Sequence, residues 1–169
     1  EFETDEIYVT PNKYPAFIED EKLSSMRSTP DEQNFYTRKP SLGGHDVIVV
    51  KDHDLDLPHF NRRVWIELFI MFQRRYAHFR DTVNALASVG IYNHLSPSGA
   101  SIQHPHAQLM ASNVIPNLLL KELHGSERWF ERNGRFVYCA LVEHELKEHT
   151  RVIYKSSSWV AFTFYDDSF

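Results

Sequence analysis

Residues 98–112 read SGASIQHPHAQLMAS, and this stretch decides the fold and the chemistry expected of the chain. Side chains alternate between the two faces of an extended strand. His104, His106 and Gln108 would therefore share one face, and the small and apolar residues between them would take the other. The rest of this segment has the composition of a buried strand. Three polar side chains on one of its faces therefore predict a functional site there.

The residues around the two histidines favour attack on a bound phosphate. The small residues 98–101 let the backbone and a hydroxyl approach an anion closely. Pro105 donates no backbone hydrogen bond and is tolerated mainly at an edge or a bulge, so we expect this segment at an open sheet edge. A neutral imidazole whose Nδ1 proton is held by a carbonyl keeps its lone pair on Nε2 and can attack phosphorus without a separate base.

Composition limits the classes of partner and the location. The chain has 169 residues, 42% hydrophobic and 24% charged, which is enough for one globular domain over residues 1–169. A formal net charge of -5 provides no basic field, so we expect neither nucleic acid nor a membrane as partner. Cys139 is the single cysteine, and neither a run of about 18 apolar residues nor a leader segment is seen, so a cytoplasmic location is expected.

The periodicity along the chain predicts an α+β fold, with a mostly antiparallel sheet and packed helices. Strands are expected at 6–10, 46–50, 88–93, 100–112, 151–155 and 159–165, the third and fourth as a hairpin. Helices are expected at 62–87, 116–130 and 135–149. In the first helix a mainly aromatic stripe should pack the core: Trp65, Phe69, Phe72, Tyr76 and either Phe79 or Val83. Residues 19–44 are expected to form a long loop that either serves the site or is poorly ordered.

The segment GASIQHPHAQ resembles the active-site signature of the galactose-1-phosphate uridylyltransferase family, the transferase branch of the histidine-triad superfamily. That signature runs Gly-small-Ser, two variable residues, His-Pro-His, a small residue and Gln. Three further segments resemble parts of the family's first histidine-triad unit, in the same order: IYVTPNKYPAF (7–17), DVIVVKDHDLDLP (46–58) and IYN (91–93). The resemblance implies a histidine-triad-like domain that forms one half of a two-unit family fold.

The resemblance also implies an activity, that of a nucleotidylyltransferase in galactose and carbohydrate metabolism. His106 would take a nucleoside monophosphate, by analogy UMP, from a nucleotide sugar and pass it to a hexose 1-phosphate. Gln108 stands where hydrolases of the superfamily have a third histidine, and its neutral amide would donate to phosphoryl oxygens, which favours transfer over hydrolysis. Ser101 matches the serine that contacts the leaving-group phosphate, and Asn12 and Asn93 match asparagines that line the nucleotide pocket.

A metal site and an assembly are implied in the same way. Bacterial-type members bind zinc through two upstream cysteines and two histidines, which correspond to His53 and His104, but the cysteines have no counterpart here. Two histidines alone make a weak structural zinc site. Zinc is therefore expected on two ligands only, and no organic cofactor is expected. Since family members are dimers that share sites across subunits, a homodimer is expected.

Two other interpretations stay open. Inorganic phosphate would replace the sugar phosphate in a nucleotide-sugar or dinucleoside polyphosphate phosphorylase. The chain would instead be a non-catalytic nucleotide-binding module if turnover had been lost with the companion half of the family fold. The individual residues also have ordinary structural interpretations, in which Ser101 and Asn93 satisfy local turns and His53 is a solvated loop residue.

Overall fold

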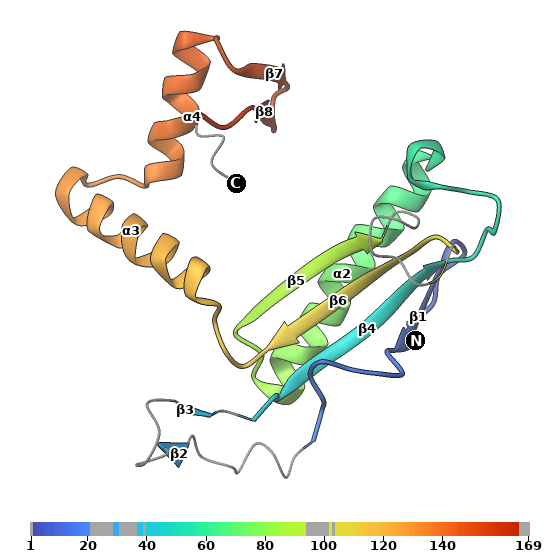
Figure 1. The fold of residues 1–169 in the computed structure, drawn as a ribbon. Helices are drawn as coiled ribbons and strands as arrows, with labels where there is room; N and C mark the ends of the chain where they lie inside the picture. Colours follow the sequence, from blue (N-terminus) through green and yellow to red (C-terminus); the bar gives the residue numbers. More distant parts are fainter. Residues whose placement is uncertain are drawn as a thin grey trace. The chain divides into compact units, whose positions relative to one another are not determined.

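A computed structural model describes residues 2–20, 29–30, 37–38, 40–93, 102 and 104–165 (Figure 1). For residues 29–30, 37–38 and 92–93 the description covers the backbone only. The chain divides into two compact units, residues 1–115 and 116–169, and each is described by itself. This division does not test the expected single domain. Most of the predicted 19–44 loop lies outside the described residues, and its end, Gly43 and Gly44, already belongs to a strand.

The first unit is built on a four-stranded antiparallel sheet. Its strands are β1 (Ile7–Pro11), β4 (Gly43–Val50), β5 (Ala87–Asn93) and β6 (His106–Ser112), in the order β1-β4-β6-β5. Each neighbouring pair is antiparallel, and β5 and β6 form the predicted hairpin. Short elements complete the unit: β2 (Thr29–Pro30), β3 (Thr37–Arg38) and the 3-10 helix η1 (Leu57–His59). The predicted α+β class with an antiparallel sheet is confirmed.

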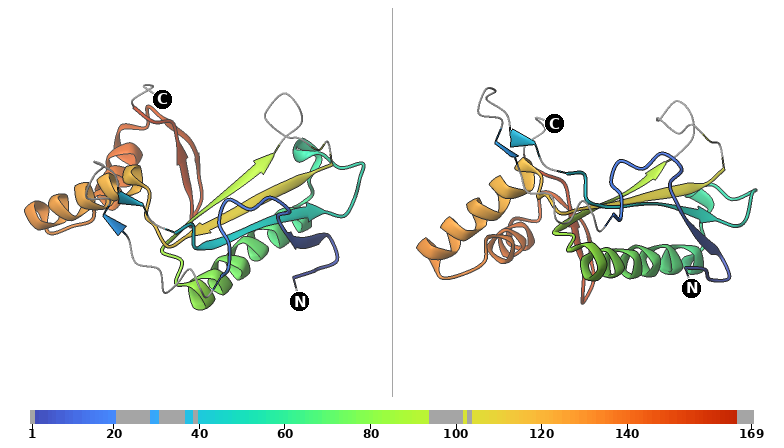
Figure 2. Two further views of the ribbon diagram at one scale, coloured as in Figure 1. Left: turned by 60° about the horizontal axis from the view of Figure 1, so that its bottom comes forward. Right: turned by 90° about the horizontal axis from the view of Figure 1, so that it is seen from below.

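Helix α2 (Arg62–Val83) covers one face of this sheet (Figure 2). The Asn61 side chain caps its start by accepting from the backbone N–H groups of Arg63 and Val64. At its end Asn84 adopts the left-handed conformation, with φ of 53°, and its N–H donates to the Phe79 carbonyl.

The stripe of α2 that enters the core agrees with the expected one at its end and differs from it before Phe79. Phe79 and Val83 are buried as expected, but before them each buried residue lies one position earlier than the expected one: Val64, Leu68, Met71 and Arg75. Phe69 is 59% exposed, whereas Trp65, Phe72 and Tyr76 pack against the flank of the core. An offset of one residue rotates the contact face by about 100°. Over this part of the helix Val64, Leu68 and Met71 therefore enter the core in place of the expected rings, whereas the ring of Phe79 does pack against β4.

The face of the sheet that packs against α2 is largely apolar and contains the buried carboxylate of Asp46. Its core residues alternate along three strands: Ile7, Val9, Ile48, Val50, Ala107, Leu109 and Ala111. Among them, the Asp46 carboxylate accepts a hydrogen bond from Arg75 Nε, and both side chains are buried. Burial raises the pKa of Asp46, and the adjacent Arg75 guanidinium opposes that rise. Removal of Arg75 would leave the buried Asp46 carboxylate without its guanidinium partner, whereas Arg75 also lies 3.9 Å from a carboxylate oxygen of Glu19.

The second unit consists of α3 (Asn117–Asn133), α4 (Val137–Glu148) and a two-stranded sheet, β7 (Val152–Lys155) with β8 (Val160–Phe162). Gly134, with φ of 66°, ends α3. The Glu145 carboxylate is 2% exposed and accepts hydrogen bonds from Arg151 at 2.8 to 3.1 Å, which joins α4 to the start of β7. Among the helices that the structure describes, none combines the length and apolar character needed to cross a membrane.

Close packing of β4 against α2 generates a stability prediction. A Cβ atom added to Gly44 would lie 1.9 Å from a ring carbon of Phe79. Gly44→Ala is therefore expected to lower the free energy of unfolding by about 1 to 3 kcal/mol, measured by urea denaturation. Gly125→Ala in α3 is the control, because a Cβ there meets no atom within 4 Å. A Gly44→Ala protein as stable as the wild type would contradict the close packing.

Candidate active site

Strand β6, which contains the second histidine of the motif, lies inside the sheet and not at its edge. In the register, His106 is paired with Val49 of β4 on one side and with Asn93 of β5 on the other. The expected open edge is therefore wrong. The missing N–H of Pro105 breaks no ladder because the paired strand begins only at His106, and the Pro105 carbonyl accepts from the Val50 N–H at 3.1 Å. The site is thus a face of the sheet.

His106 and Gln108 lie on the face away from α2. Ala107 and Leu109, which alternate with them, are buried in the core against the helix. The ring of His106 is 6% exposed, and its Nδ1 lies 2.8 Å from the backbone oxygen of His104. A carbonyl oxygen only accepts, so Nδ1 is the donor and the lone pair of the neutral ring is on Nε2. This is the tautomer that the sequence argument required of a nucleophile.

Gln108 belongs to a group of three polar side chains from three segments. Its Oε1 lies 2.7 Å from Nε2 of His45 and 3.2 Å from Nδ2 of Asn12. Asn12, expected at the nucleotide pocket, is thereby brought to the site. His45 was not anticipated, because the expected strand began at residue 46 and left His45 in the loop. A strand that begins at Gly43 places His45 on the same face as Gln108. Extending the expected strand by one residue toward its start would have shown that His45 shares a face with residues 47 and 49.

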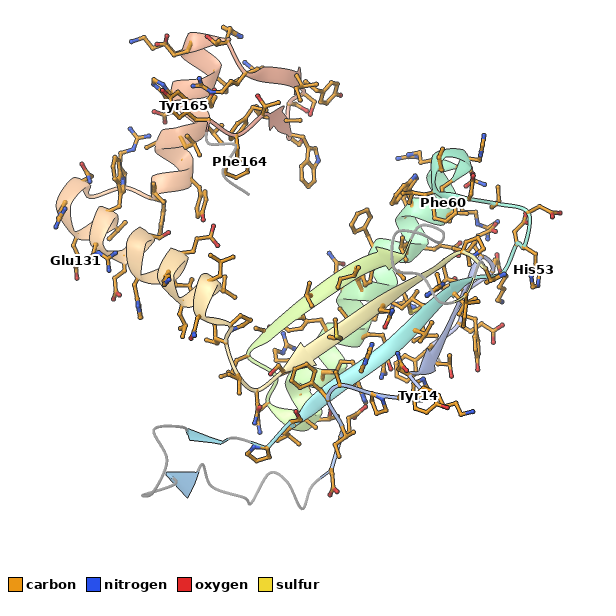
Figure 3. All side chains as sticks on the ribbon, viewed as in Figure 1. Tyr14, His53, Phe60, Glu131, Phe164 and Tyr165 are labelled. Carbon is orange, nitrogen blue, oxygen red and sulfur yellow. The ribbon has the colours of Figure 1, made fainter. Side chains whose placement is uncertain are left out.

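The two proposed zinc ligands also lie together. His53 follows β4 (Figure 3), and its ring centroid is 4.3 Å from that of His104. Nε2 of His104 lies 2.5 Å from the Val50 carbonyl, so that nitrogen serves as a donor to the backbone. In the described part of the chain, no group of three His, Cys, Asp or Glu side chains is placed to hold a metal. These two histidines alone therefore do not fit a tetrahedral zinc site.

Two expected site residues are not placed by the structure. Ser101 lies outside the described residues. Asn93 is described through its backbone, which pairs with His106 across β5 and β6. Their roles at a leaving-group phosphate and in a nucleotide pocket stay predictions.

Comparison with known proteins gives relatives with two different names, a phosphorylase and a uridylyltransferase. No family model matches the chain. It is 27% identical over 156 residues to an ADP-glucose phosphorylase of Arabidopsis thaliana, covering 90% of this chain and 42% of that protein. It is 22% identical over 174 residues to a galactose-1-phosphate uridylyltransferase of Schizosaccharomyces pombe, covering 90% of this chain and 45% of the relative. The chain therefore spans less than half the length of these two relatives.

A solved structure shares the fold over a similar part of the chain. The crystal structure of an ADP-glucose phosphorylase from Arabidopsis thaliana with bound ADP-glucose superposes with a TM-score of 0.72 at 25% identity. The match covers 92% of this chain and 46% of that one. The similarity thus extends through nearly all of the present chain.

The bond between His106 and the His104 carbonyl generates a second stability prediction. In His106→Asn the side-chain amide still reaches that carbonyl as a donor, whereas His106→Ala leaves the oxygen without it. The asparagine variant is therefore expected to exceed the alanine variant in free energy of unfolding by about 1 kcal/mol, measured by urea denaturation. Equal stability of the two variants would show that this bond contributes nothing.

Proposed function

We propose, from the premise that the chain belongs to the galactose-1-phosphate uridylyltransferase family of the histidine-triad superfamily, that it transfers a nucleoside monophosphate through a covalent intermediate on His106. The observation that carries the proposal is the hydrogen bond from His106 Nδ1 to the His104 carbonyl. It fixes the ring in the tautomer with a nucleophilic Nε2, on the same strand face as a neutral amide donor, Gln108.

The proposed reaction consists of two displacements at one phosphorus atom. In the first, the Nε2 lone pair of His106 attacks the α-phosphorus of a nucleotide sugar, the N–P bond forms, and the bond to the bridging oxygen breaks. The sugar 1-phosphate leaves with that electron pair. In the second, a phosphate oxygen of the acceptor attacks the same phosphorus and the N–P bond breaks, which returns the pair to Nε2. Neither step requires a proton transfer.

Two features of the site support this sequence. The ring of His106 gains positive charge as the N–P bond forms, and the His104 carbonyl that accepts from Nδ1–H stabilises that charge. Gln108 supplies a neutral donor to the phosphoryl oxygens where a histidine would be able to transfer a proton. A site without a proton donor at this position favours a phosphate nucleophile over water.

The donor and the acceptor are proposed by analogy with the relatives. The name galactose-1-phosphate uridylyltransferase supports UMP transfer to a hexose 1-phosphate, which is the leading proposal. The 27% identical relative is named ADP-glucose phosphorylase, and this supports inorganic phosphate as acceptor in a second candidate function. Three properties of the complete protein stay predictions: zinc bound by His53 and His104 with further ligands, a homodimer, and a cytoplasmic location. No step of the proposed reaction depends on them.

The covalent step is tested by labelling. The complete protein is incubated with UDP-glucose or ADP-glucose that carries ³²P at the α-phosphorus, and protein-bound label is measured after denaturation in base and in acid. Acid-labile, base-stable label is expected on the wild type and none on His106→Asn, which keeps the structural hydrogen bond. Label on the variant would contradict the role of His106, and bound nucleotide without label on the wild type would support a non-catalytic module.

The acceptor is tested by discharge of that label. The labelled protein, freed of excess donor, is mixed with galactose 1-phosphate, glucose 1-phosphate or inorganic phosphate, and the released nucleotide is identified. The leading proposal expects rapid discharge by a hexose 1-phosphate and slow loss to water. Rapid discharge by inorganic phosphate alone would establish the phosphorylase in its place.

A further inference from the structure

We infer that His45 is a positioning residue that, together with Asn12, holds the Gln108 amide with its NH₂ group directed to the reacting phosphate. The inference rests on the proposed function, because it assigns to Gln108 the donor role in that reaction. The inference goes beyond the proposed function because it names the residues that orient the Gln108 amide. The two branches of an amide have the same shape but opposite hydrogen-bonding character, so an unrestrained glutamine would present either branch.

The tautomer of His45 is set by a backbone donor. The backbone N–H of Ala16 donates to its Nδ1 at 3.1 Å. Nδ1 therefore holds the lone pair, and the neutral ring carries its proton on Nε2. That Nε2 is 2.7 Å from Oε1 of Gln108, so the ring donates to the glutamine oxygen.

Asn12 lies in the segment after β1 that also contains Tyr14 (Figure 3). Its Oδ1 accepts from the Tyr14 N–H at 2.8 Å, which identifies Nδ2 as the donor branch. Nδ2 lies 3.2 Å from Oε1 of Gln108. It also lies 3.1 Å from Nε2 of His45. Both Asn12 Nδ2 and His45 Nε2 carry hydrogen. They therefore donate side by side to one acceptor, Oε1 of Gln108.

Two backbone N–H groups, those of Tyr14 and Ala16, therefore set the direction of the Gln108 amide through two side chains. Two donors converge on Oε1, and a flipped amide would lose both hydrogen bonds and bring N–H groups against N–H groups. The NH₂ branch is what remains to donate to a ligand beside His106, two residues away on the same face. If His45 had a purely structural role, it would join the same segments without influencing the reaction. The test must therefore separate a positioning role from a structural one.

The test is a double-mutant cycle on the complete protein. The variants are His45→Phe, which keeps a ring but no donor, Gln108→Ala, and the two combined. The readout is the rate of label transfer to His106 at saturating nucleotide sugar, with KM measured alongside. We expect His45→Phe to slow the step about tenfold, less than the roughly 100-fold loss of a whole oxyanion donor, with KM changed less than twofold. In the Gln108→Ala background it should have no further effect.

Two matched variants sharpen the cycle. His45→Gln offers an amide N–H to the same oxygen and should recover most of the rate, whereas Met110→Leu, at the position paired with His45, disturbs only packing and should leave it unchanged. Multiplicative losses from His45→Phe and Gln108→Ala, or an effect on KM alone, would overturn the positioning role. All variants are compared by thermal unfolding, so that a loss of fold is recognised.

A readout that needs no turnover completes the test. Proton–nitrogen correlation spectra of protein labelled with ¹⁵N-histidine distinguish the two tautomers, and the His45 signals are assigned by their loss in His45→Gln. We expect the Nε2–H tautomer, and an Nδ1–H ring would overturn the inference. A wild type that takes up no label overturns the proposed function, whereas a labelled wild type with independent losses overturns the positioning role alone.

Discussion

The hydrogen bond from the His106 ring to the His104 carbonyl is the interaction on which the proposed chemistry depends. Donor and acceptor are two residues apart, so the backbone between them sets the geometry. That backbone is restrained from both sides, by the fixed φ of Pro105 and by pairing of His106 with β4 and β5. A nucleophile held in this way loses little further freedom when it reacts, since its tautomer and orientation precede the ligand.

The sheet separates the structural from the chemical requirements of the chain. One face packs against α2 through aliphatic side chains and the buried Asp46–Arg75 pair, with Gly44 allowing the ring of Phe79 to approach the strand. The other face carries His45, Gln108 and His106 on two neighbouring strands. Because side chains alternate, each strand contributes to both faces, and a shift of one residue in register would exchange them.

Local patterns in the sequence predicted the local features of the structure. The hairpin, the long helix and the common face of His106 and Gln108 follow from periodicity over a few residues. What the patterns did not contain was the pairing of β4 with both β1 and β6, since partners distant in sequence decide which strand is interior. Pro105 therefore resembles an edge signal in the sequence, although in the structure it only precedes the paired strand.

The other differences between the expected and the observed structure also arise from features that local sequence patterns do not contain. Before Phe79 the core stripe of α2 is displaced by one residue, because the fit between helix and sheet decides which of its apolar side chains enter the core. His45 was missed because the beginning of a strand is poorly marked in a sequence, and one strand residue was enough to hide a polar partner of Gln108. His53 and His104, for which the resemblance implied zinc binding, lie together, but the described residues supply no third metal-ligating side chain beside them.

Mass spectrometry of the complete protein after exposure to a panel of nucleotide sugars tests the central claim most directly. The account predicts a gain of one nucleoside monophosphate, lost in acid and located by fragmentation on His106. An adduct located on another residue, or an unmodified protein with nucleotide demonstrably bound, would contradict it.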